Sequence, residues 1–178
     1  IEVYKPHYIV NLGDWYEGLA AKRWSRYDDE EWSVYDEHRA VAKQAQAINE
    51  VAPQAEKIWL NGNHEDNLFG SQPDRLPKDL REAVDWRNFK PTADALAGWR
   101  HIAEYRDSTK VRLGPITFQH GCAISATAEK DAGYLYGVPY GLYCCGHTHR
   151  VVPVTQAVER KIKMPYWYCN PGTGMDFE

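Results

Sequence analysis

The sequence lacks the features that define several large classes of protein. It has no apolar run long enough for a membrane span, and no stretch that resembles a signal peptide. It has no excess of positive charge, since its formal net charge is -4, which argues against wholesale coating of nucleic acid or of an acidic membrane. We therefore expect a cytoplasmic protein that does not contact a membrane.

Cysteine is also scarce, with 4 residues in the second half of the chain. Their spacing matches neither a zinc ribbon nor a redox Cys-x-x-Cys motif. Cys144, Cys145 and Cys169 lie in apolar or aromatic runs, where cysteine behaves as a small buried hydrophobe. Adjacent residues of a strand point to opposite faces, so a bridge between Cys144 and Cys145 is not expected. We expect reduced thiols, which suits the cytoplasm.

What the sequence does contain is enough for a folded domain with a core. The 178 residues are 43% hydrophobic, with charges interspersed, and we expect one domain over residues 1–178. The N-terminal third of the sequence predicts a strand, a helix and a second strand, which is the pattern of a βαβ unit. These elements are expected at Tyr8–Leu12, Asp28–Val51 and Lys57–Leu60.

The rest of the chain predicts shorter elements around an irregular segment from Leu68 to Thr109. A hairpin is expected because Gly114-Pro115 interrupts an apolar run. The expected elements are a short helix at 79–86, the hairpin at 111–119, a helix at 126–135, and strands at 141–145, 151–155 and 166–169. This alternation predicts the α/β class.

Polar clusters follow the ends of several predicted strands, where the ligands of α/β proteins usually bind. They offer a carboxylate, an amide oxygen and imidazoles, a mixture that suits Mn, Fe, Zn or Ni better than Mg or Ca. We also expect Thr148 to place the two flanking histidines on one side of an extended chain. The clusters are Gly13-Asp14, Gly62-Asn63-His64-Glu65, His120-Gly121 and Gly146-His147-Thr148-His149.

These clusters, in this order, resemble the signature of the calcineurin-like metallophosphoesterases, and the resemblance spans Gly13 to His149 with a closing Asn-Pro-Gly turn at Asn170. It implies a two-sheet β-sandwich flanked by helices. It also implies an enzyme that hydrolyses phosphate esters with a hydroxide bridging two divalent metal ions. Manganese is the metal we expect first, with Fe, Zn, Ni and Mg as alternatives.

The resemblance also implies roles for individual residues. Asp14 matches the carboxylate that bridges both metals, and His149 matches a ligand of the first metal. The ligands of the second metal are matched by Asn63, His120 and His147.

Two further residues match the catalytic positions of the family. His64 matches the residue that contacts the scissile phosphate and helps to protonate the leaving oxygen. Glu65 occupies the acidic position after that histidine and is expected to hold it in place.

The chain departs from the family at its beginning, where an Asp-x-His pair supplies two further ligands of the first metal. Nothing before Gly13 provides this pair. We expect a chain trimmed at its N-terminus by about two dozen residues, because the missing strand needs a crossover before the next parallel strand. The first metal then keeps only Asp14 and His149 from this chain.

A second departure concerns the substrate. Protein phosphatases of the superfamily carry Arg-Gly soon after the Gly-Asp motif, whereas this chain has Trp15-Tyr16-Glu17-Gly18. This favours phosphodiesters over phosphomonoesters. The alternatives are a phosphomonoesterase acting on proteins or small molecules, and a non-catalytic binding module with an incomplete metal site.

Nucleic acid is one phosphodiester that the chain is a candidate to bind. Aromatic and basic residues alternate after Asp14, and such side chains can stack on bases and hold phosphates. The alternative is that these aromatics face the core or cover the sheet edge. The stretch includes Trp15, Tyr16, Lys22, Arg23, Trp24, Arg26, Tyr27, Trp32 and Tyr35.

Overall fold

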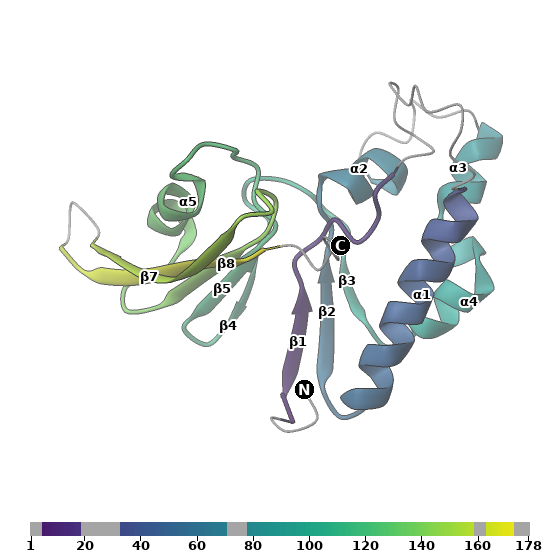
Figure 1. Ribbon diagram of the computed structural model, residues 1–178, viewed down its shortest axis with the longest axis horizontal. Helices are drawn as coiled ribbons and strands as arrows, with labels where there is room; N and C mark the ends of the chain where they lie inside the picture. The colour runs from purple at the N-terminus through teal and green to yellow at the C-terminus, as the bar shows by residue number, and fades with distance from the viewer. Residues whose placement is uncertain (1–4, 19–32, 71–77, 159–162, 173–178) are drawn as a thin grey trace. The chain divides into compact units, whose positions relative to one another are not determined.

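The computed structural model of the chain describes residues 5–18, 33–70, 78–158 and 163–172. Within these residues the fold is mixed α/β, with two sheets and several helices, which confirms the predicted class. The chain divides into two units, residues 1–105 and 106–178, and each is described by itself (Figure 1). The single domain stays a prediction.

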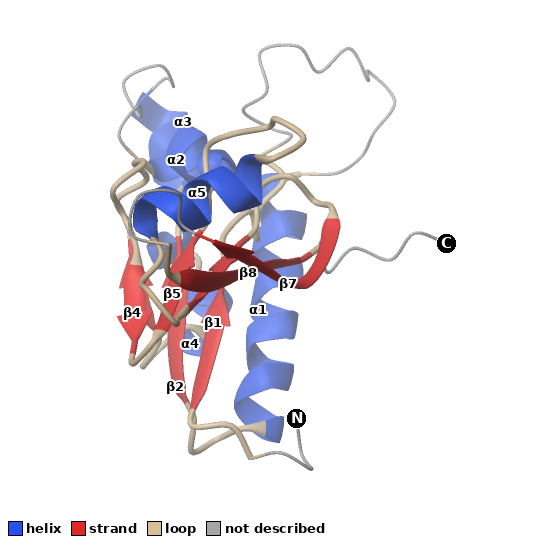
Figure 2. Ribbon diagram, turned by 90° about the vertical axis from the view of Figure 1, so that its left-hand side faces the viewer, coloured by secondary structure: helices blue, strands red, loops and turns tan. Residues whose placement is uncertain are grey.

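The first unit contains a parallel sheet in the order β1-β2-β3. Its strands are β1 (Tyr8–Asn11), β2 (Glu56–Leu60) and β3 (Arg100–Ile102). The long helix α1 (Val34–Val51) connects β1 to β2, which confirms the βαβ unit (Figure 2). The helix begins after Ser33, whose backbone N–H and hydroxyl both donate to Asp36 Oδ2. The predicted start at Asp28 lies outside the described residues.

The segment between β2 and β3 is more regular than the sequence predicts. It contains helices α2 (Asn63–Phe69), α3 (Lys78–Val84) and α4 (Lys90–Ala95), and a 3₁₀ turn η3 (Trp86–Asn88). The prediction of an irregular segment is wrong here because Pro91 lies in the first turn of α4, where a missing N–H costs no helical hydrogen bond. The helix predicted at 79–86 corresponds to α3.

An apolar core joins the helices of this unit to its sheet. The buried face of α1 packs with Trp59 of β2, and α1 and α4 lie side by side (Figure 1). The helical spacing of Val41 and Ala45 places both on that face. The buried residues of the core are Tyr16, Val34, Val41, Ala42, Ala45, Trp59, Leu68, Val84, Ala95, Leu96 and Trp99.

The second unit contains a mixed sheet in the order β4-β5-β6-β8-β7. Its strands are β4 (Val111–Leu113), β5 (Ile116–Gln119), β6 (Leu142–Cys145), β7 (Val151–Val158) and β8 (Pro165–Pro171). The predicted hairpin is confirmed, because β4 and β5 are antiparallel and Gly114 turns between them with φ of 58°. Strands β7 and β8 are longer than predicted.

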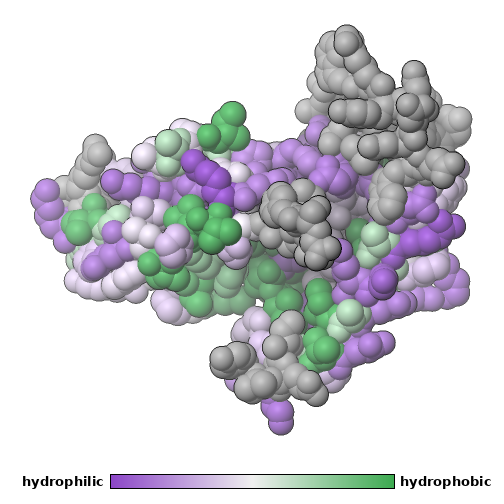
Figure 3. Space-filling view, in the orientation of Figure 1, coloured by the Kyte–Doolittle hydropathy of each residue, from purple (hydrophilic) through white to green (hydrophobic). Residues whose placement is uncertain are grey.

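Helix α5 (Ala128–Tyr136) connects the parallel strands β5 and β6 and packs on β8. The close approach depends on Gly133, because a Cβ there would lie 2.9 Å from the ring of Tyr166. At the edge of the sheet, β7 exposes the side chains of Val151, Val154 and Val158. Figure 3 shows apolar residues scattered among hydrophilic ones on the visible surface of this unit. None of the helices in the described part of the chain combines the length and apolar character that crossing a bilayer requires.

Candidate metal centre

The predicted bridging residue, Asp14, lies in a left-handed turn at the carboxyl end of β1. Gly13 and Asp14 have φ values of 97° and 54°. Asn11 stabilises the turn, since its Oδ1 accepts the N–H of Gly13 at 2.8 Å. A non-glycine residue rarely adopts this conformation, and such residues cluster at functional sites. The turn directs successive backbone N–H groups toward one acceptor.

That acceptor is the carboxylate of Glu65, which is 0% exposed. Its two oxygens accept the backbone N–H groups of Asp14 at 2.9 Å, Trp15 at 2.5 Å, Tyr16 at 3.1 Å and Gly62 at 2.8 Å. Hydrogen bonds of this kind from backbone N–H to a carboxylate are stronger than neutral ones. Glu65 therefore joins the turn after β1 to the start of α2.

The ionisation of Glu65 reflects two opposing influences. Burial raises its pKa, and the neighbouring charge of Asp14 adds to that effect. The N–H groups of Gly62 and Tyr16 act in the other direction, because they stabilise the carboxylate. The net result is a pKa above the usual value.

His64 is held by the same turn. Its backbone N–H donates to Asp14 Oδ1 at 3.1 Å, and its Nδ1 lies 3.0 Å from the carbonyl oxygen of Tyr16. Because a carbonyl only accepts, this contact favours the tautomer with the proton on Nδ1. Glu65 thus reaches His64 through Tyr16, whose N–H it binds. Asn63, half-buried, begins α2.

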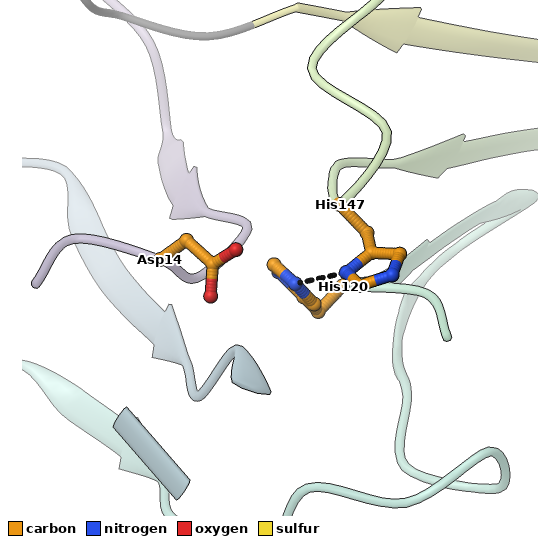
Figure 4. A group of neighbouring side chains, drawn as sticks. All are labelled: Asp14, His120 and His147. Atoms are coloured by element: carbon orange, nitrogen blue, oxygen red, sulfur yellow. Dashed lines mark hydrogen bonds between the residues drawn. The ribbon is translucent and has the colours of Figure 1, made fainter. Parts of the chain in front are cut away.

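In the second unit, the rings of His120 and His147 lie edge to face. His120 follows β5 and His147 follows β6, two neighbouring parallel strands. His120 Nε2 lies 3.2 Å from His147 Nδ1, with the ring planes inclined at 72°. Figure 4 draws this contact as a dashed line, and also draws Asp14 of the first unit.

This separation suits two ligands of one metal ion. Histidine nitrogen binds zinc at about 2.0–2.1 Å, so two such nitrogens on a tetrahedral ion lie roughly 3.3 Å apart. His120 is 3% exposed, and His147 is half-buried, so water screens the pair poorly. The donor chemistry and spacing of these two residues therefore fit a divalent cation such as zinc or manganese.

The loop after β6 corrects one expectation. His147 and His149 have φ values of 60° and 56°, so the His-x-His segment is a left-handed loop and not an extended chain. The expectation was wrong because β6 ends at Cys145, before the motif. His149 lies exposed at the far end of the loop. Two histidines in this conformation indicate a loop that its surroundings hold in place.

A buried hydrogen-bond network, which the sequence did not predict, fixes this loop in place. Glu129 of α5 is 2% exposed and accepts the hydroxyl of Thr148 at 2.5 Å. Asn170 of β8 donates to the carbonyl of Gly146 at 2.9 Å and to Thr148 Oγ1 at 2.8 Å. Arg150 forms an ion pair with Glu129 at 3.0 Å. The loop is therefore held on both sides of His147.

The charge of Glu129 is compatible with its burial. Burial opposes ionisation, but the hydrogen bonds from Thr148 and Asn170 and the charge of Arg150 outweigh it. The pKa of Glu129 consequently lies below its usual value. No sequence signal distinguishes Glu129, because an acidic residue in the first turn of a helix is ordinary. The asparagine of the Asn-Pro-Gly turn was the one available signal.

The first two aromatic residues after Asp14 do not offer the exposed rings that base stacking requires. Tyr16 is 1% exposed and belongs to the core, and Trp15 packs against that core. Tyr35 is exposed, at 46%. The remaining aromatic and basic residues of the stretch lie outside the described residues. The nucleic-acid interpretation therefore loses its first two aromatic contacts.

The predicted residues thus come together in two local sets. In the first unit, the turn of Asp14 lies with His64 and Glu65. In the second unit, His120 lies with His147. A common site for both sets stays a prediction. No protein-family model, curated protein or solved structure matches the chain.

Proposed function

We propose that the chain is a metal-dependent hydrolase of phosphate esters, of the calcineurin-like metallophosphoesterase type, acting on phosphodiesters. The observation that carries the proposal is the neighbouring pair His120 and His147, whose Nε2 and Nδ1 atoms are 3.2 Å apart. The order of the four polar motifs supports the same conclusion. The metallophosphoesterase fold, with its two-sheet β-sandwich, is part of this proposal.

The proposed ligands divide between two ions. His120, His147 and Asn63 are the proposed ligands of one ion, and Asp14 and His149 are those of the other, with Asp14 shared between both. Imidazole together with oxygen donors suits manganese, iron or zinc. When bound, such a pair of ions supplies hydroxide at neutral pH and neutralises the charge of the phosphate.

His64 is the proposed general acid. Its Nδ1 is engaged by the carbonyl oxygen of Tyr16 at 3.0 Å, so the exchangeable proton of the imidazolium is the one on Nε2. The imidazolium can pass this proton to a leaving alkoxide, as a general acid does. The contact with Tyr16 fixes the orientation of the ring and leaves Nε2 available.

Glu65 and Glu129 act through the loops that they hold. Glu65 binds the N–H groups around Asp14 and thereby orients the carboxylate that is proposed to bridge the ions. Glu129 binds Thr148 between the two histidines of the second loop. Neither carboxylate needs to touch the substrate for this purpose.

The choice of a phosphodiester rests on the residues after Asp14. Trp15 and Tyr16 occupy the place where protein phosphatases of the superfamily carry Arg-Gly, and both side chains pack in or against the core. A guanidinium that would hold the extra charge of a phosphomonoester is therefore missing at this place. The phosphomonoesterase remains the second candidate.

Hydrolysis of model esters tests the proposal. The manganese-loaded full-length protein should hydrolyse bis-p-nitrophenyl phosphate faster than p-nitrophenyl phosphate. His64→Gln should lower kcat by about 100-fold or more, with metal content unchanged. His147→Ala should weaken manganese binding, measured by calorimetry, by more than about 100-fold, because even changes beyond the ligands can cost that much.

His7→Gln is the matched control, because His7 is an exposed histidine outside every motif. It should leave both activity and metal binding unchanged. Preference for the monoester would identify a phosphomonoesterase, and phosphopeptides, nucleotides and single-stranded DNA then separate the substrate classes. Metal binding without turnover of either ester would identify a binding module. A protein that binds no divalent metal would overturn the proposal.

A further inference from the structure

Two cysteines of the second unit lie side by side on neighbouring strands. Cys144 of β6 and Cys169 of β8 are direct partners in a parallel pair. Their Sγ atoms are 3.3 Å apart, and both residues are half-buried. Both thiols are free. The neighbouring Cys145 is buried, as expected for adjacent residues of a strand that face opposite sides.

We propose that Cys144 and Cys169 form a reversible modification site, at which a low-molecular-weight disulfide such as oxidised glutathione produces an intrachain disulfide. Neighbouring strands lie about 4.8 Å apart, which falls within the Cα separations that disulfides span. The two sulfur atoms must approach to about 2.05 Å, a movement that rotation of the side chains and a small approach of the strands provide.

The two thiols differ in reactivity. The hydrogen bond with Cys144 lowers the pKa of Cys169 to about 7, against the opposing effect of burial. The same hydrogen bond, together with burial, raises the pKa of Cys144. Since the thiolate is the nucleophile, Cys169 attacks first near neutral pH.

The reaction balances as two successive exchanges. The Cys169 thiolate attacks one sulfur of oxidised glutathione, forms a mixed disulfide and releases one glutathione thiolate. Cys144 then loses its proton to solvent, attacks Cys169 Sγ and releases the second glutathione thiolate. Two thiols are oxidised, and one glutathione disulfide is reduced to two thiols. Excess reduced thiol reverses both steps.

The two cysteines lie next to the loop after β6 that carries His147 and His149. Cys169 directly precedes Asn170, whose side chain donates to Gly146 and Thr148 of that loop. Cys144 is the second-last residue of β6, which leads directly into the loop. Closure of the disulfide therefore changes the spacing of the two strands that carry the loop and its anchor. The inference does not depend on the hydrolase proposed above.

Mass spectrometry tests the inference directly. The metal-free, full-length protein is incubated with excess oxidised glutathione, and the remaining thiols are then alkylated. The expected product has lost both thiol hydrogens and carries no attached glutathione. Its digest should contain a cross-linked peptide that joins Cys144 to Cys169. Dithiothreitol should restore both thiols.

The variants separate this pair from the other cysteines. Cys144→Ser should stop the reaction at the mixed disulfide on Cys169. Cys122→Ser is the matched control, because Cys122 is exposed, and it should leave closure unchanged. Circular dichroism confirms that each variant is folded. Absence of the cross-link in the folded protein, or a cross-link that requires Cys122, would overturn the proposal.

Discussion

Each of the two units holds a loop of positive φ with one buried glutamate, but the two glutamates do so by different chemistry. In the first unit, Glu65 binds backbone N–H groups at the margin of a large apolar core. In the second unit, Glu129 binds the side chains of Thr148, Arg150 and Asn170. A backbone anchor tolerates changes in the bound side chains, whereas a side-chain anchor depends on each of them.

The two carboxylates also differ in ionisation. The pKa of Glu65 is raised by burial and by Asp14, whereas the pKa of Glu129 is lowered because Thr148 and Arg150 outweigh its burial. The first loop is thus held mainly by many hydrogen bonds, and the second by a charge with matched partners. We therefore expect substitutions in the first unit to have the larger effects.

The largest effect should come from the aromatic core of the first unit. Trp59 is 0% exposed and contacts Trp15 with ring centroids 5.8 Å apart. Trp59→Ala should lower the free energy of unfolding by about 4 kcal/mol, because it removes a large buried ring and leaves a cavity. Urea denaturation followed by circular dichroism measures it. Tyr140→Ala, at a 64% exposed position, is the control. An equal loss there would show that the burial of Trp59 does not set the cost of its removal.

Glu65→Gln should have the next largest effect. An amide retains one acceptor oxygen, so two of the backbone N–H groups that Glu65 binds lose their acceptor. The expected loss is about 3 kcal/mol in the free energy of unfolding. Glu56→Gln, at an exposed position of β2, should cost little in the same measurement. Equal stability of the two variants would show that Glu65 is not an anchor.

The partly buried His101 of the first unit should make the free energy of unfolding depend on pH in the acid range. Burial, followed by the charge of Arg87, lowers its pKa to about 4. An unfolded histidine binds its proton near pH 6.5, so stability should fall by about 2 kcal/mol as the pH drops from 6.5 to 4. His101→Gln keeps a donor for Asn61 Oδ1, which the native Nε2 contacts at 2.6 Å, and should flatten this slope. Parallel pH profiles for the two proteins would exclude His101 as the cause.

The anchor of the second unit should respond less, and with a different pH dependence. Glu129→Gln keeps an acceptor for Thr148 but removes the charge opposite Arg150, and should cost about 1 kcal/mol at neutral pH. Because the folded pKa of Glu129 is lowered, its contribution is present above the ordinary value of 4.5 and is lost as the pH falls through the folded pKa. Denaturation at neutral and acidic pH measures the difference. A cost that grows in acid would have the wrong sign.

The smallest effect should come from Arg150, whose side chain is 42% exposed. Arg150→Met should cost about 0.5 kcal/mol, because solvent screens a half-exposed ion pair. High salt should reduce the cost further. A loss as large as that of Glu129→Gln, measured in the same denaturant series, would show that the ion pair with Arg150 accounts for the whole contribution of the Glu129 charge.

The sequence predicts the elements whose signals are local. The βαβ unit follows from apolar runs and helical spacing, and Glu65 follows from its place in the Gly-Asn-His-Glu motif. Glu129 could not be predicted, because its partners Thr148 and Asn170 are 19 and 41 residues away along the chain. Nor could the left-handed loop, because a positive φ is uncommon even for histidine, although histidine adopts it more often than most residues do.

The aromatic core has a practical consequence for the optical properties of the protein. Among the described tryptophans, Trp167 lies on β8, and the others belong to the first unit at Trp15, Trp59, Trp86 and Trp99. Trp59 stacks on His101 with ring centroids 4.2 Å apart, so protonation of that imidazole should quench its fluorescence. In a Trp167→Phe protein, emission from these residues would follow the unfolding of one half of the chain alone.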